Sequence, residues 1–92
     1  MNGDGFEKAI GVFFQPQGLE YTRQMRSALD RDPDYLKTHR EIVTQGVQEV
    51  LTSSGIFWDE ESLRERALKL VWEAVVRLRC VEVERKVGRN QG

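Results

Sequence analysis

The chain has 92 residues, a formal net charge of −1 and a single cysteine. This length fits one domain, and 32% charged with 39% hydrophobic residues is typical of a globular chain rather than a disordered one. The near-balance of 14 basic and 15 acidic side chains argues against broad electrostatic attraction to nucleic acid or an anionic membrane, and one cysteine excludes an internal disulfide.

Targeting and membrane signals are also absent from the sequence. No segment approaches the roughly 20 apolar residues that cross a bilayer. The first residues lack the basic stretch of a signal peptide. Because a lone cysteine suits a reducing compartment, we expect a cytoplasmic, intracellular location with no membrane contact.

Two helices are predicted in the first third of the chain. Apolar residues recur at helical spacing over residues 5–14, which predicts a short helix. A strand over residues 9–14 is the alternative, since short apolar runs fit both structures. After a break at Pro16 and Gly18, residues 19–30 carry a second amphipathic pattern and predict a second helix.

A third helix is predicted over residues 33–52. Asp32 can cap its N-terminus, and Pro33 suits the first helical position, where its missing N–H costs nothing. His39 lies near the middle of the predicted apolar stripe, where we expect a half-buried ring. Gly46 shares that stripe and suggests close approach of another backbone, which we expect from the last helix; a glycine with no structural role is the alternative. The rest of the stripe comprises Tyr35, Leu36, Ile42, Val43, Val47, Val50 and Leu51.

The last helix is predicted to be the longest, over residues 59–85, with a flexible tail at 86–92. Gly55 can end the preceding helix, residues 56–58 are expected to plug the end of the core, and Asp59 caps the new helix. Alternating side chains at 78–84 leave a strand as the alternative there. The main apolar stripe comprises Leu63, Ala67, Leu70, Val71, Ala74, Leu78 and Val81.

The sequence therefore predicts an all-α fold. Residues 1–92 form one domain, a small orthogonal or up-down bundle of about four helices.

A second apolar stripe on the last helix gives the main functional prediction. It lies opposite the main stripe and comprises Leu68, Trp72, Val76 and Val83. One stripe is enough to dock the helix on its own domain, so the second requires another cover. We expect a non-enzymatic protein-interaction module, either a homodimer formed through this helix or a subunit of a larger assembly.

Nucleic-acid binding is the alternative function. Five basic residues gather within residues 23–40, and such clusters bind phosphates when they share one face. Interleaved Asp30, Asp32 and Asp34 would cancel part of their field. The candidate contacts are Arg23, Arg26, Arg31, Lys37 and Arg40.

A calcium-dependent switch is a third, weaker possibility. Asp30, Asp32, Asp34 and Glu41 have the spacing of ligands in an EF-hand loop. However, Tyr35 occupies the place of the glycine that turns such a loop, and Pro33 starts a helix where the loop should continue. No set of acid, base and nucleophile can be assembled around Cys80 or His39, so we expect no enzymatic activity, no resident metal and no cofactor.

Overall fold

The computed structural model describes the backbone of residues 2–91 and the side chains of residues 5–82. Every regular element in that part of the chain is a helix, which confirms the all-α class. The five helices are α1 (Asn2–Val12), α2 (Pro16–Arg31), α3 (Tyr35–Thr38), α4 (Arg40–Ser53) and α5 (Glu60–Gln91). A strand was the alternative for residues 9–14 and 78–84. Residues 9–12 and 78–84 are helical, and residues 13 and 14 form a turn.

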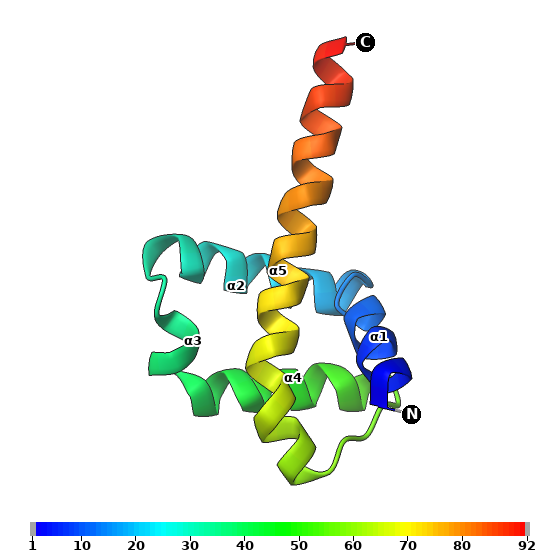
Figure 1. Cartoon of the computed structure of the whole chain (residues 1–92), viewed down its shortest axis with the longest axis vertical. Coiled ribbons are helices and arrows are strands. Elements are labelled where there is room, and N and C mark those ends of the chain that lie inside the picture. The colour runs from blue at the N-terminus through cyan, green and yellow to red at the C-terminus, as the bar shows by residue number, and fades with distance from the viewer. Residues whose placement is uncertain (1, 92) are drawn as a thin grey trace.

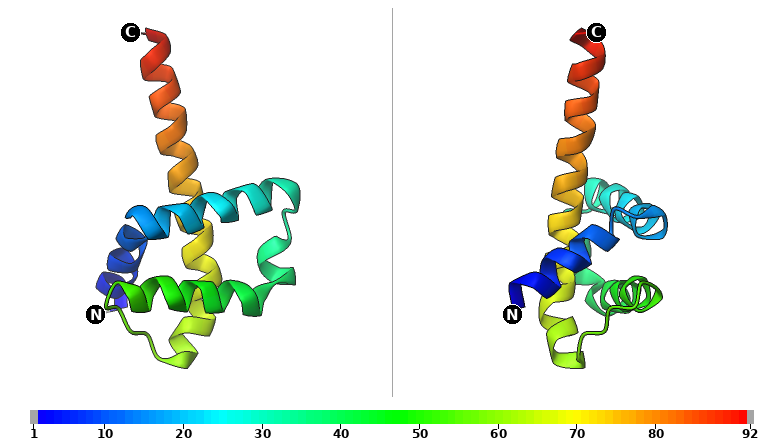
Figure 2. Two further views of the ribbon diagram at one scale, coloured as in Figure 1. Left: turned by 180° about the vertical axis from the view of Figure 1, so that it is seen from behind. Right: turned by 90° about the vertical axis from the view of Figure 1, so that its right-hand side faces the viewer.

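The helices are arranged in two layers that cross. Helices α2 and α4 run side by side on one side of the long helix α5, which passes across both (Figure 1). Helix α3 joins α2 to α4 at one edge, and α1 lies at the opposite edge. The C-terminal part of α5 extends beyond the other helices, as all three views agree (Figure 2). The helices thus cross rather than run up and down (Figure 1), and five of them, against the predicted four or so, occur in the described residues.

The core lies mainly where α5 meets α1, α2 and α4, and α3 packs against α2 and α4 at its edge. Most of the predicted main stripe of α5 is at most 5% exposed: Leu63, Ala67, Leu70, Val71, Ala74 and Leu78. Val75, which lies between the two stripes, is buried as well. Opposing side chains come from every other helix, namely Ala9, Ile10, Phe13, Met25, Leu29, Leu36, Val43, Val47 and Leu51.

Gly18 and Thr22 fix the joint between α1 and α2. A Cβ on Gly18 would lie 2.2 Å from the Val12 carbonyl oxygen, so only glycine allows the two backbones to approach this closely. One turn later, the buried Thr22 hydroxyl lies 3.0 Å from the Phe13 carbonyl oxygen and 2.8 Å from that of Gly18. Pro16 occupies the first turn of α2. It was expected to lie in a break, but it starts the helix three residues before the predicted position.

The predicted single helix over 33–52 is wrong, because two helices occupy that range. The Asp32 carboxylate accepts the backbone N–H of Asp34, so it stabilises a turn and the helix starts only at Tyr35. The chain turns again at His39, whose φ of −114° and ψ of 36° are not helical. Helices α2 and α4 cross α5 at different points along its length (Figure 1). The break at His39 allows α3 to span the distance between them. His39 therefore lies at a junction and contacts the Tyr35 ring at a centroid distance of 4.5 Å.

Three apolar residues are more exposed than expected. Ile42 is 65% exposed because it lies well to the side of the stripe formed by Val43 and Val47. Phe57 is 77% exposed, so only Ile56 and Trp58 of the 56–58 connector pack against the core. Val81 continues the main stripe but is 41% exposed, near the end of the part of α5 that α2 contacts through the Arg26–Glu82 pair.

The two ends of α5 differ in how well they were predicted. Gly55 has the expected positive φ of 79°, and Asp59 accepts the Ser62 backbone N–H at 3.1 Å as an N-cap. The helix then continues to Gln91, so residues 86–91 do not form the predicted tail. Once a helix exists, each further residue adds one hydrogen bond at little cost, and no proline follows Arg85 to stop it. Residue 92 lies outside the described part of the chain.

Candidate interaction surface

The outer face of α5 carries exposed apolar side chains in the middle of the helix. Trp72 lies about 160° around the helix axis from the fully buried Ala74, and Trp72 is 50% exposed. Val76, one turn later, is 37% exposed. Leu68, one turn earlier, packs partly against the core and extends the same strip. The fourth predicted residue, Val83, belongs to α5, but its side chain lies outside the described residues.

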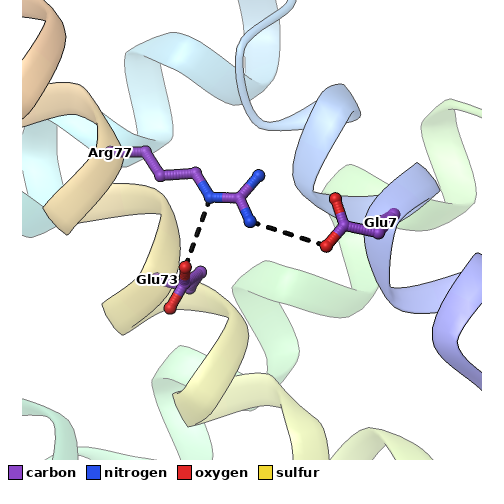
Figure 3. Close-up of polar contacts among 3 residues, drawn as sticks. All are labelled: Glu7, Glu73 and Arg77. Atoms are coloured by element: carbon purple, nitrogen blue, oxygen red, sulfur yellow. Dashed lines mark hydrogen bonds and ion pairs between the residues drawn. The ribbon is translucent and has the colours of Figure 1, made fainter.

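One edge of this outer face is fixed by an ion-pair cluster between α1 and α5. The Arg77 guanidinium lies 3.3 Å from the Glu73 carboxylate, one turn away on α5, and 3.5 Å from the Glu7 carboxylate of α1 (Figure 3). The three side chains are partly or largely exposed, so each pair contributes little to stability. Their role is to set the position of α1 beside α5.

The other edge is held by two ion pairs between α2 and α5. Arg26 pairs with Glu82, and Asp30 pairs with Arg79. The paired residues are spaced four apart on α2 and three apart on α5, so both pairs lie along one seam. This seam holds α2 against α5 near the point where α5 leaves the body.

Besides the Glu73–Arg77 pair, four charged residues of α5 lie on or beside the outer face. Glu61, Glu65 and Lys69 are exposed, as is Arg79, whose guanidinium extends to Asp30 at the α2 edge. Glu65 makes no hydrogen bond or ion pair among the side chains of residues 5–82. Along α5, Glu65 thus precedes Trp72, and Arg79 follows it.

The five basic residues predicted to contact nucleic acid lie on three helices. Two have intramolecular partners: Arg26 pairs with Glu82, and the Arg40 guanidinium donates to the Arg64 carbonyl oxygen at 3.2 Å. Arg23, Arg31 and Lys37 are exposed. Nucleic-acid binding through these residues stays a prediction.

The structure does not form the predicted calcium loop. Residues 35–38 and Glu41 are helical, which breaks the twelve-residue loop that an EF-hand needs. Asp30 pairs with Arg79, and the Asp32 carboxylate accepts a backbone N–H. Within the described residues, no three His, Cys, Asp or Glu side chains are placed to hold a metal ion. The spacing in sequence therefore reflects a helix end followed by a turn.

A shallow polar groove of about 620 Å³ lies between the N-terminal halves of α4 and α5. Arg40, Glu41, Glu60 and Arg64 lie around it. Arg64 pairs with Glu60 at 3.4 Å, and Arg40 binds the Arg64 carbonyl, so both cations already have partners. Only Leu63 of the lining is buried, so the groove is open and its charged side chains are largely exposed.

The outer face of α5 is thus the strongest candidate for a functional surface in the described part of the chain. Cys80 is exposed near its C-terminal end, which makes it available as a label site. None of the helices, over the residues that the structure describes, is long and apolar enough to cross a membrane. No protein-family model, curated protein or solved structure matches this chain.

Proposed function

We propose that this protein is a non-enzymatic interaction module that forms a homodimer through the outer face of α5. The observation that supports this proposal is a half-exposed tryptophan one helical turn from an exposed valine, on the side of α5 opposite the core. Large aromatic side chains that become buried at an interface supply much of its binding energy. We place the dimer in the cytoplasm, because the single cysteine suits a reducing compartment.

Other exposed apolar residues support the proposal less well. Phe57 lies in the connector before α5, and Ile42 lies on α4. Each is separated from the Trp72–Val76 strip by buried core residues or by the length of a helix. Single exposed apolar side chains are common on soluble proteins, whereas adjacent ones on one helix face are a typical docking surface.

The test is the effect of matched substitutions on self-association. We expect Trp72→Glu to raise the dimer dissociation constant by about tenfold or more, because it removes a central aromatic and places two carboxylates in the contact. Phe57→Glu is the control, since it also replaces an exposed aromatic but lies off the α5 face. Light scattering on a sizing column gives the mass of each variant, and circular dichroism checks its helicity.

Equal behaviour of the two variants would count against the proposal. If both weaken self-association to the same degree, the contact is not centred on Trp72. If neither changes it, the outer face of α5 is not the interface.

A further inference from the structure

We propose that the two α5 helices pair antiparallel, with the two-fold axis of the dimer beside Trp72. This inference rests on the proposed function, since it specifies how a second copy of the chain covers the outer face of α5. It follows from the order of apolar and charged side chains along that face.

The apolar side chains of the face that the structure describes are symmetric about Trp72. Leu68 lies four residues before it and Val76 lies four residues after it. In an antiparallel pair centred on Trp72, the two helices run in opposite directions. A residue that lies a given number of positions before Trp72 is therefore level with the residue the same number of positions after Trp72 in the second copy. Leu68 is then level with Val76 of the second copy, and the two indole rings meet at the axis.

Two of the charges on the face, Glu65 and Arg79, follow the same symmetry with opposite sign. Glu65 lies seven residues before Trp72, and Arg79 lies seven residues after it. Both are exposed, and Glu65 has no ion-pair partner among the described side chains of its own chain. Arg79 uses Nη2 to bind Asp30, which leaves other N–H groups of the guanidinium for a second carboxylate. The antiparallel pair therefore gains two Glu65–Arg79 contacts, one at each end.

Two other arrangements of the same two helices bring like charges together. A parallel pair places Glu65, Lys69 and Arg79 each level with its own copy. An antiparallel pair centred two residues later, at Ala74, places Lys69 level with Arg79 of the second copy. In the arrangement centred on Trp72, Lys69 is level with the buried Val75 and meets no charge. Since like charges at an interface suppress wrong pairings, the pattern favours the Trp72-centred dimer.

The native Cys80 tests the orientation without an engineered label site. With helix axes about 10 Å apart and a rise of about 1.5 Å per residue, the antiparallel pair separates the two Cys80 Cα atoms by about 26 Å. A parallel pair brings them to about 10 Å. A spin label on Cys80, read by double electron–electron resonance in protein that still has the mass of a dimer, is expected to give the long distance. A short distance in such a dimer would overturn the orientation and leave the proposed function standing.

Charge reversals test the register. Glu65→Arg is expected to raise the dissociation constant about fivefold, and the double variant Glu65→Arg/Arg79→Glu is expected to restore it to within about twofold of the wild type. Lys69→Glu is the matched control on the same face and should leave the constant unchanged. A tighter dimer in Lys69→Glu would instead identify the Ala74-centred register and overturn the proposed one.

The outcomes separate this inference from the function on which it rests. Arg79→Glu also removes the ion pair with Asp30, so circular dichroism checks the helicity of the double variant. The Glu65→Arg single variant and the Cys80 distance do not depend on this substitution. A wild-type chain that stays monomeric at every concentration overturns both the dimer and its orientation. A dimer with unchanged affinity in Glu65→Arg overturns the register alone.

Discussion

Gly46 lies in the middle of α4, where glycine costs about 1 kcal/mol relative to alanine. The structure explains it by a side chain rather than by the backbone approach from the last helix that the sequence suggested. A Cβ on Gly46 would lie 2.7 Å from the Tyr21 ring of α2. The Tyr21 hydroxyl donates to the Val43 carbonyl oxygen at 3.2 Å, and burial, followed by the nearby Tyr35 and Glu49, raises the pKa of Tyr21 well above its ordinary value.

We therefore expect Gly46→Ala to destabilise the protein by about 1 kcal/mol, because overpacking against the Tyr21 ring exceeds the gain in helix propensity. In a Tyr21→Leu background, the same change should become neutral or stabilising. Gly11→Ala is the control, since a Cβ there meets nothing within 4 Å. Urea denaturation of the double-mutant cycle measures the coupling. Equal gains in stability from Gly46→Ala and Gly11→Ala would show that Tyr21 does not occupy this space.

At the scale of single residues, burial was easier to predict than polar contacts. The 3.6-residue period correctly placed Leu63, Ala67 and Leu70 in the core, because burial follows directly from which side of a helix a residue occupies. The Arg26–Glu82 and Asp30–Arg79 pairs join residues about 50 positions apart. Only the packing of α2 against α5 brings them together, so no local signal could reveal them.

Among the elements, α5 has the clearest start signal. The Ser62 hydroxyl and backbone N–H donate to the Asp59 carboxylate and hold the pKa of Asp59 below its usual range. A carboxyl whose pKa is lowered by folding stabilises the native state at pH values above its unfolded pKa of about 3.9. This contribution is lost as the pH falls through the lower, folded pKa.

Replacement of Asp59 should therefore have a pH-dependent effect. At pH 7, Asp59→Ala is expected to lower the unfolding midpoint because it removes both the cap and a negative charge at the N-terminus of α5. As the pH falls below about 4, the midpoints of wild type and variant should converge. Asp59→Asn is the matched control, since an uncharged cap should show a weaker pH dependence. Thermal melts from pH 7 to pH 2 provide the measurement, and a constant gap between wild type and Asp59→Ala would contradict this account.

The break between α3 and α4 shows why the sequence could not give every element. The residues around His39 keep a helical pattern, since Leu36, Val43 and Val47 are all buried on one side. The chain nevertheless turns at His39 because α2 and α4 cross α5 at different levels (Figure 1). That requirement belongs to the tertiary arrangement, and local propensity yields to it.

For the whole molecule, the division of α5 into a covered and an uncovered part is the central feature. The main stripe is buried as far as Leu78, and Val81 is 41% exposed. The C-terminal part of α5 then extends past the other helices (Figure 2). The sequence identified the two faces of this helix, but it could not show which positions the rest of the chain covers. Trp72 is exposed because α2 and α4 both lie on the other side of α5, and α1 reaches only its edge.

The most direct test of the account is the solution mass of the wild-type chain across a wide concentration range, measured by sedimentation equilibrium. We expect the mass to rise from that of one chain toward that of two as the concentration increases, in a single reversible step. High salt should lower the dimer fraction if ion pairs such as Glu65–Arg79 contribute to the contact. A mass that stays at one chain at every concentration would contradict the claim that a second copy covers the outer face of α5.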